Sequence, residues 1–173
     1  MNQVIECLKT RRSCRSFLPE QVPEDKLQAI LEAGTYAASG RNLQAAKIVV
    51  LQNPEDIATL ERLNAEILGA PEAHPFFGAP TVCVVLTDPA VYTGVEDAAL
   101  VMGNLMNAAH SLGVGSCWIH RARQEFDSPE GKALLKKWGV EGEYIGVGHC
   151  LLGIPDGECR PAAPRKEDYV TRV

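Results

Sequence analysis

The sequence lacks the long apolar runs that a membrane-spanning helix needs. Such a helix takes about 20 consecutive apolar residues, and no segment of this 173-residue chain is both that long and that apolar. The first ten residues, MNQVIECLKT, also lack the basic start and apolar stretch of a secretory signal peptide. We therefore expect a cytoplasmic protein with no membrane partner.

Basic charge is scarce as well. Lysine and arginine number 17 against 22 aspartate and glutamate residues, for a formal net charge of −5 and a pI near 5.4. Proteins whose main partner is nucleic acid usually present a basic surface, whereas the basic residues here form only small clusters, so nucleic acid is not an expected partner. The apolar fraction of 46% is ordinary for a globular protein, and we expect one folded domain over residues 1–173.

Cysteine is present, but not in the patterns of metal sites or disulfide frameworks. The sequence contains no Cys-x-x-Cys pair, and its six cysteines are Cys7, Cys14, Cys83, Cys117, Cys150 and Cys159. No spacing of cysteine and histidine resembles a zinc site, so no metal is expected. A chain of this length and apolar content needs no disulfide staples. Ordinary reduced thiols are therefore expected.

Hydrophobic periodicity predicts helices and strands in alternation. Helical spacing of apolar residues occurs in segments 4–8, 23–34, 53–67, 95–113 and 128–138. Short apolar runs predict strands at 46–52, 79–88, 116–120 and 144–153. This order favours an α+β fold with a mixed or antiparallel sheet of about four strands flanked by helices. Segment 95–113 is apolar nearly all round and is expected to form the central, buried helix.

Two further segments bear on the architecture. The glycine-rich stretch LGVGSC (112–117) follows a helix and leads into a strand, which is the reverse of a dinucleotide-binding loop, so a Rossmann domain is not expected. The last 20 residues, 154–173, are proline-rich and charged. They contain too few apolar residues to form a stable structure alone, and we expect them to be either disordered or held by something else such as a second subunit.

Positive charge is concentrated in RRSCRSF, residues 11–17. Arg11 and Arg15 are four residues apart and share one side if the preceding helix continues, with Ser13 between them. Guanidinium and hydroxyl donors together suit a terminal phosphate. Cations that complement the dipole at a helix C-terminus are the alternative interpretation, and this segment alone favours that alternative.

Two more polar segments could contact a ligand. AASGRNLQ (37–44) places Ser39, Asn42 and Gln44 in a loop between a helix and a strand. Amide side chains carry donors and acceptors together and suit a heteroaromatic edge or sugar hydroxyls, although the segment alone is equally typical of a capped turn. APRKED (163–168) adds Arg165 and Lys166, which by themselves are typical of a solvated terminus.

Taken together, these segments resemble the nitroreductase family of FMN-dependent flavoproteins. RRSCRSF is similar to the family's Arg-x-Ser-x-Arg-x-Phe motif, ASGRNLQ to its Pro-Ser-x-x-Asn-x-Gln loop, and PRK to its C-terminal Arg/Lys segment. AAHSLGVGSCWIH resembles the helix–Gly–strand segment beside the flavin ring, and VGHCLLGIP the late strand that ends in a Gly-x-Pro turn. The ordered set, which extends from residue 4 to 166, is far more specific than any one block.

The resemblance implies a nitroreductase-like fold and an NAD(P)H-dependent FMN oxidoreductase. Hydride would pass from NADH or NADPH to an electron-poor small molecule such as a nitroaromatic or quinone, with flavin N5 carrying the hydride and no catalytic side chain. It also implies a homodimer that exchanges a C-terminal arm, residues 155–173. The implied FMN-binding residues are Arg11, Arg12, Ser13 and Arg15 at the phosphate and ribityl chain, Ser39, Asn42 and Gln44 from the partner subunit or rim, Trp118, Ile119, His120 and Arg121 along the ring, and Arg165 with Lys166 from the tail.

The sequence departs from the family pattern in places. Ala38 stands where the family usually has proline, and Ala45–Ala46 replace its usual Pro-Trp, which leaves substrate preference open. Segment 64–78 matches no binding element of the family. Two alternative functions also stay open: a protein that binds or stores a flavin or nucleotide without turnover, and a redox protein that uses the thiol of Cys117 or Cys150.

Overall fold

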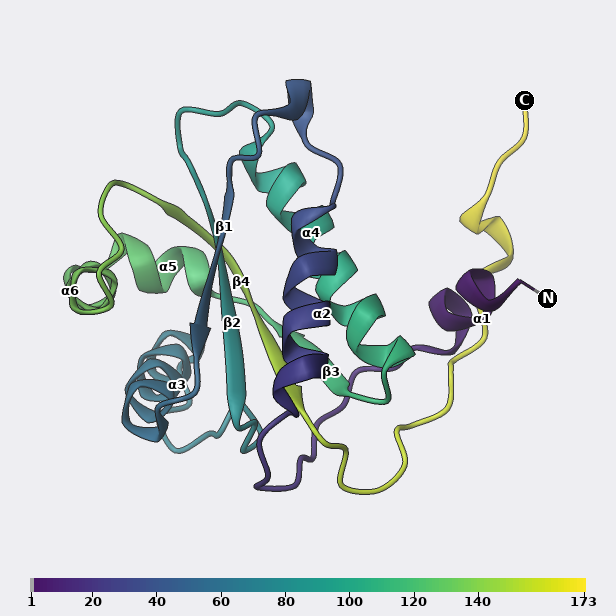
Figure 1. Ribbon diagram of the computed structural model, residues 1–173, viewed down its shortest axis with the longest axis horizontal. Coiled ribbons are helices and arrows are strands. Elements are labelled where there is room, and N and C mark those ends of the chain that lie inside the picture. Colours follow the sequence, from purple (N-terminus) through teal and green to yellow (C-terminus); the bar gives the residue numbers. More distant parts are fainter. Residues whose placement is uncertain (1) are drawn as a thin grey trace.

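The computed structural model describes residues 2–173 and is built around one four-stranded sheet (Figure 1). The strands are β1 (Ala46–Leu51), β2 (Thr81–Thr87), β3 (Gly115–Ile119) and β4 (Ile145–Gly153), in the spatial order β1-β2-β4-β3. Every neighbouring pair is antiparallel. The predicted α+β fold is confirmed, and of the two sheet types expected the antiparallel one is present.

Helices cover both faces of the sheet (Figure 1). One face carries α2 (Glu24–Thr35) and α4 (Gly94–Ser111), and the other carries α3 (Pro54–Leu68), α5 (Ala122–Asp127) and α6 (Pro129–Lys137). A short helix, α1 (Gln3–Thr10), lies away from the sheet beside the end of α4, where the Cys7 thiol donates to the Asn107 carbonyl. No helix within residues 2–173 is long and apolar enough to cross a bilayer.

The core consists of two apolar layers separated by the sheet. Strand β2 is buried along its whole length because helices cover both of its faces. Its alternate residues accordingly enter different layers: Cys83 and Val85 pack on the α2–α4 side, and Val82 and Val84 pack on the other side. An uninterrupted apolar run is the expected pattern for such a strand.

Local capping explains where several helices begin and end. The Asn53 side chain accepts hydrogen bonds from the N–H groups of Glu55 and Asp56 at the start of α3, and Gly69 ends that helix in the left-handed conformation (φ 76°). The expectation that Pro23 is the first helical residue is wrong by one position, because its ψ of 136° is extended and it serves as the N-cap of α2. Helix α5 was not predicted.

Helix α4 is only partly the buried helix that its composition suggests. The side facing α2 and the sheet is buried and includes Ala98, Met102 and Leu105. On the outer side, Leu100 is 51% exposed and Val95 is 41% exposed. The single chain therefore leaves an apolar strip of α4 uncovered.

The C-terminal segment leaves the sheet after β4 and runs past α1 (Figure 1). A bridge between Phe17 and Pro155 is its last strand-like contact, and every residue from Asp156 to Val173 is exposed. Its only regular element among the described residues is a single 3-10 turn, Glu167–Tyr169. The tail thus has no core of its own, as its composition predicts.

Candidate functional site

The arginine-rich segment, residues 11–17, is extended and lies against β3. Helix α1 ends at Thr10, and Arg11 already has an extended ψ of 136°. Ser13 forms a parallel bridge with Ser116, and the Cys14 N–H donates to the Ser116 carbonyl at 2.9 Å. The helical arrangement considered for the arginines is therefore wrong, because pairing with β3 straightens the chain.

Arg11 is distinguished by an unsatisfied donor. Its Nη1 atom is buried and makes no hydrogen bond within residues 2–173, and the same holds for the hydroxyl oxygen of Ser116. A buried polar atom without a partner costs about 1–3 kcal/mol, and more when the group is charged. These atoms therefore fit an acceptor that is not part of the chain, and the phosphate of FMN is such an acceptor.

Arg12 uses its guanidinium differently. Its Nη1 donates to the carbonyl oxygens of Lys9 at 2.9 Å and of Arg11 at 2.6 Å. These bonds satisfy carbonyls around the last turn of α1, which is the role of a cation at a helix C-terminus. The sequence interpretation that favoured a helix end thus describes Arg12, whereas Arg11 is left available for a ligand.

The same segment lies next to the last turn of α4. The Thr10 hydroxyl and the Nε2 atom of His110 are 2.9 Å apart. Burial lowers the pKa of His110 from its ordinary value of 6.5, and the charges of Arg11 and Arg12 lower it further. The corner between α1 and the end of α4 thus brings two arginines near this imidazole, although the whole chain is acidic.

Neither thiol of the redox hypothesis is activated. Burial raises the pKa of Cys117, against opposing effects of Arg15, Ser13 and Arg11. Burial also raises the pKa of the fully buried Cys150 well above its usual value. Because the thiolate is the reactive form, the structure disfavours both cysteines as redox nucleophiles.

The loop of residues 39–44 forms a second polar group. Arg41, Asn42 and Gln44 all have positive φ angles, of 52°, 56° and 50°, and such conformations are uncommon for residues other than glycine. Within the loop, the Gln44 amide donates to Asn42 Oδ1 at 3.1 Å, and the Gln44 N–H donates to the Ser39 hydroxyl at 3.1 Å. The three predicted ligand residues are therefore brought together in one strained loop.

Asp97, in the first turn of α4, accepts hydrogen bonds that hold this loop in place. The Gly40 N–H donates to both carboxylate oxygens of Asp97, at 3.0 and 3.1 Å, and the Thr93 hydroxyl donates to one of them at 3.1 Å. A Cβ atom on residue 40 would lie 2.2 Å from that hydroxyl, so only glycine fits. Asp97 was missed from the sequence, where its one signal is a carboxylate at the start of a largely apolar helix.

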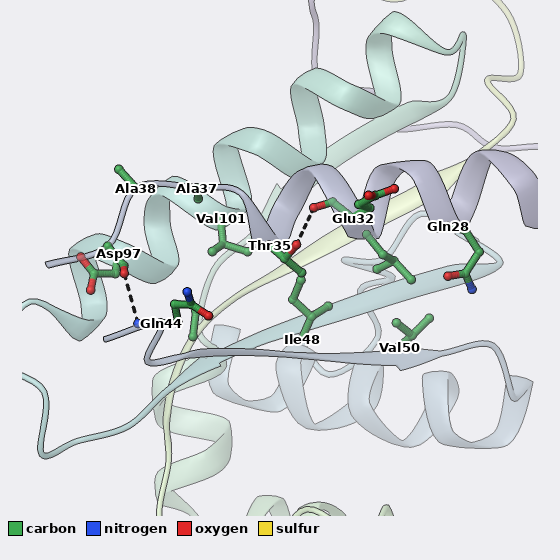
Figure 2. Close-up of a pocket in the computed structure, with 13 residues that line it drawn as sticks. Gln28, Glu32, Thr35, Ala37, Ala38, Gln44, Ile48, Val50, Asp97 and Val101 are labelled. Atoms are coloured by element: carbon green, nitrogen blue, oxygen red, sulfur yellow. Dashed lines mark hydrogen bonds between the residues drawn. The ribbon is translucent and has the colours of Figure 1, made fainter. Parts of the chain in front are cut away.

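A cavity of about 670 Å³ opens beside this loop between α2, β1 and α4 (Figure 2). Ala38, Gln44 and Asp97 lie toward one end of it, and Gln28 and Val50 lie toward the other. Ser39 and Ala46 also line it. Two of the alanines that replace larger residues of the family pattern, at positions 38 and 46, are thus part of the cavity wall.

The loop and the arginine segment lie at opposite ends of α4 (Figure 1). Asp97 holds the loop at the first turn, and at the last turn His110 contacts Thr10, which directly precedes the arginine segment. Asp97 and His110 are 13 positions apart, which at about 1.5 Å per helical residue corresponds to about 20 Å. One copy of the chain therefore does not bring the two groups together.

The turn that follows β3 is held by a buried polar cluster, defined as Asn64, Arg121, Glu125 and His149. The Asn64 amide donates to the His120 carbonyl at 3.0 Å and to Glu125 Oε1 at 2.8 Å, and the Arg121 Nε donates to Asn64 Oδ1 at 3.0 Å. Glu125 Oε2 pairs with His149 Nε2, and the side chains of Asn64, Glu125 and His149 are fully buried.

This polar cluster gives a role to Asn64, the first residue of segment 64–78, which the resemblance to the family had left without one. Arg121 has a φ of 79°, which turns the chain sharply from β3 into α5. Asn64 fixes that turn by contacting residues on both sides of the peptide bond between positions 120 and 121. Two hydrogen bonds to Asn64 therefore restrain the turn.

The other predicted residues of this region differ in exposure. Trp118 is half-buried and packs so closely on Gly148 that a Cβ atom there would lie 2.4 Å from its Nε1. Ile119 is buried in the layer on the α3 side, and His120 is exposed. Trp118 and Ile119 therefore support the strand, and the His120 side chain has no contact that indicates catalysis.

The two predicted tail residues are not brought to the arginine segment within one chain. Arg165 is exposed, and its Nε and Nη2 donate to the Ala163 carbonyl at 3.3 and 2.8 Å. Lys166 is exposed as well.

Among residues 2–173 no group of three or more histidine, cysteine or acidic side chains is placed to hold a metal ion.

Comparison with known proteins yields a consistent set of relatives. The model of the nitroreductase family matches residues 8–154. A nitroreductase from Bacteroides fragilis, solved with bound FMN, is 31% identical with a TM-score of 0.91, and each chain is covered completely. A nitroreductase from Desulfitobacterium hafniense, also with bound FMN, is 29% identical with a TM-score of 0.89 over 100% of this chain and 99% of the other.

Among curated proteins, an NADH dehydrogenase from Thermus thermophilus is 32% identical over 142 residues. The match covers 82% of this chain and 63% of that protein. The chain likewise spans 59% and 56% of the length of two further curated relatives.

Proposed function

Because the chain belongs to the nitroreductase family, we propose that it is an FMN-dependent oxidoreductase that transfers hydride from NADH or NADPH to an electron-poor acceptor. FMN is bound in the two similar solved structures, and a 27% identical protein from Bacillus subtilis is named FMN reductase [NAD(P)H]. Bound FMN supplies the hydride chemistry at its ring, so the protein's part is to bind, orient and tune it.

The observation that carries the proposal is the buried, unpaired Nη1 of Arg11, together with the unpaired hydroxyl of Ser116 on the strand that pairs with the arginine segment. A phosphate monoester carries nearly two negative charges at neutral pH and offers three strong acceptor oxygens. We infer that Arg11, Ser13 and Arg15 hold the phosphate and the ribityl chain. The Nη1 atom of Arg12 is already bonded to the carbonyls of Lys9 and Arg11, so Arg12 would contribute through its other guanidinium nitrogens.

The turn after β3 is the proposed support of the flavin ring. Residues 118–121 form the end of β3 and the turn after it, and β3 is the strand that pairs with the arginine segment. A ligand anchored at Arg11 can therefore extend along these residues. The buried polar cluster fixes the His120–Arg121 peptide. We infer that a backbone N–H of this turn donates to the ring, because its position is set by protein contacts before the ligand arrives.

A second copy of the chain explains how the remaining residues reach the same ligand. If the α4 helices of two subunits pack antiparallel about a two-fold axis, loop 39–44 of one subunit lies near Arg11 of the other. Uncovered apolar side chains on the outer surfaces of α1 and α4 support such packing; they are Val4, Ile5, Leu8, Val95 and Leu100.

We therefore propose a homodimer with two sites between the subunits. Ser39, Asn42 and Gln44 would come from the partner, and the arm of residues 155–173 would be exchanged and bring Arg165 and Lys166 to the phosphate. The full exposure of residues 156–173 in the single chain is in keeping with an arm whose contacts are on another subunit.

The acceptor is proposed to be a small molecule. The cavity beside loop 39–44 measures about 670 Å³, which is within the usual range for small-molecule sites. Ala38 and Ala46 leave that wall of the cavity open. Nitroaromatics and quinones have the flat, electron-poor rings that suit such a space.

Anaerobic reduction of the FMN-loaded protein tests the proposal. We expect the yellow flavin absorbance to bleach with NADH or NADPH and to return when a nitroaromatic or quinone is added. A protein that binds FMN but is reduced by neither donor would support the alternative of flavin storage. A colourless protein whose redox activity is lost on alkylation would support the thiol alternative.

A further inference from the structure

Two cysteines that the proposed function does not use, Cys14 and Cys159, line the same cavity. This cavity measures about 450 Å³ and is enclosed by residues 13–16 on one side and residues 156–160 on the other. Cys14 lies in the arginine-rich segment, and Cys159 lies at the start of the C-terminal tail. The two are 145 positions apart in the sequence.

Backbone pairing brings the two segments together. The Leu18 N–H donates to the Ile154 carbonyl at 2.9 Å, and the Asp156 N–H donates to the Ser16 carbonyl at 3.0 Å. Phe17 and Pro155 form an antiparallel bridge between these two bonds. Beyond this pairing Gly157 has a φ of 85°, which turns the tail, and residues 156–160 face residues 13–16 across the cavity.

The two thiols differ in access. Cys14 is 4% exposed, and its thiol donates to the Ser16 carbonyl at 3.1 Å. Cys159 is exposed on a segment with few contacts. Burial raises the pKa of Cys14, and interaction with the Cys159 thiol raises it further, which indicates that the two sulfur atoms are neighbours.

We propose that Cys14 and Cys159 are a modification site at which hydrogen peroxide forms an intramolecular disulfide. The thiolate of Cys159 attacks one peroxide oxygen, the O–O bond breaks, and the products are a sulfenic acid on Cys159 and, after protonation, water. The Cys14 sulfur then attacks the sulfenic sulfur, the S–O bond breaks, and a second water leaves with the Cys14 proton. The two thiols lose two electrons in all, and the peroxide gains them.

The bond would tie the start of the arm to the segment that contains Ser13 and Arg15. Because Cys14 is flanked by both of these residues, we expect oxidation to change how firmly FMN is held. That consequence rests on the proposed function, whereas formation of the bond does not. The bond can therefore be tested by mass alone, whatever the cofactor and activity prove to be.

Peptide mapping of the intact chain tests the site. The protein is treated with hydrogen peroxide, its remaining thiols are alkylated under denaturing conditions, and it is digested with trypsin and a glutamate-specific protease. We expect residues 13–15 to be joined to residues 159–165, with the mass of the whole chain lowered by two hydrogens and restored by dithiothreitol. FMN retained on the oxidised and reduced forms is compared in parallel.

The variants that test the site are chosen because Cys159 is exposed whereas Cys14 is buried. Cys159→Ser alters only an exposed side chain and should abolish the cross-linked peptide, whereas the matched control Cys7→Ser should leave it intact. The proposal is overturned if peptide 13–15 is still fully alkylated after Cys159 has been oxidised. It is equally overturned if Cys159 becomes a sulfinic acid, or joins a second chain or a different cysteine.

Discussion

Arg11 is the residue whose surroundings depend most on a ligand, because its buried Nη1 has no partner within the described chain. Arg11→Ala should weaken FMN binding by about 1.5–3 kcal/mol, the usual value for hydrogen bonds to a charged group. Riboflavin, which lacks the phosphate, should bind the wild type and the variant about equally. Titration of the apoprotein with both flavins measures the difference.

The control for this prediction is Arg123→Ala. Arg123 lies on α5, and its one ion pair within residues 2–173 is an exposed one with Asp127, so its loss should leave FMN affinity unchanged. If Arg11→Ala binds FMN as the wild type does, or loses riboflavin and FMN to the same extent, the phosphate is bound elsewhere.

His110 should make the stability of the apoprotein depend on pH. Its pKa in the folded chain is lowered, by burial and then by Arg11 and Arg12, from the value of 6.5 expected when unfolded. The unfolded chain therefore takes up the proton first as the pH falls. The free energy of unfolding should be unaffected by His110 well above pH 6.5 and should decrease as the pH falls from 6.5 through the lower folded pKa.

Urea unfolding of the wild type and His110→Gln between about pH 8 and pH 5 isolates this contribution. The decrease attributable to His110 should be absent in the variant and present in His120→Gln, since His120 is exposed. Identical pH profiles of wild type and His110→Gln would show that the folded chain does not lower the pKa of this imidazole.

At the scale of secondary-structure elements, the buried polar cluster joins α3, α5 and β4 through Asn64. Asn64→Leu would remove the bonds that Asn64 makes to the His120 carbonyl, to Glu125 Oε1 and to the Arg121 guanidinium. We expect a loss of about 2–4 kcal/mol in the free energy of unfolding, because three hydrogen bonds are lost together and the atoms that made them are left in a buried site. Chemical denaturation measures this loss.

Asn104→Leu is the matched comparison. Asn104 lies on α4 and donates one hydrogen bond, to the Ala33 carbonyl, so its replacement should cost about 1 kcal/mol. Equal losses in the two variants would mean that the cluster adds nothing beyond a single hydrogen bond. A shift of the flavin reduction potential in Asn64→Leu alone would further support the role proposed for the turn after β3.

The elements that could be predicted from sequence are those whose signals are local. Asn53 before Pro54 marks the start of α3, and the apolar run of β2 marks a strand with both faces covered. Helix α5 was missed because six residues are too few to show a helical period. The extended course of residues 11–17 was missed because it depends on pairing with β3, about 100 positions away.

The same distinction holds for the candidate site. Arg11, Ser39 and Gln44 could be nominated because their residue types recur in a recognisable order. The roles of Asp97 and Asn64 could not, since each acts on residues 56 or 57 positions away in the sequence. The separation of the two ligand groups along α4 is also a property of the folded chain alone.

For the whole molecule, the main prediction concerns assembly. Deletion of residues 155–173 should loosen the dimer and release FMN together, because the arm is proposed to contribute to both the interface and the phosphate site. Light scattering and flavin absorbance on intact and truncated protein measure the two effects. A shorter deletion, residues 170–173, keeps Arg165 and Lys166 and should retain FMN.

Two results would contradict this prediction. One is an intact protein that is monomeric at micromolar concentration and still holds FMN, which would also remove the argument that loop 39–44 comes from a partner. The other is a truncated protein that loses FMN but remains a dimer, which would assign the arm to cofactor binding alone.

The strand order β1-β2-β4-β3 also determines when the sheet can be completed during translation. Strand β4 joins β2 to β3, yet it is the last of the four to be made. At about 5–20 residues per second, the 66 residues from the end of β2 to the end of β4 take roughly 3–13 seconds to translate. Throughout that interval the apolar β2 has a partner on one edge only, and its other edge stays open to pairing with other chains until β4 is made.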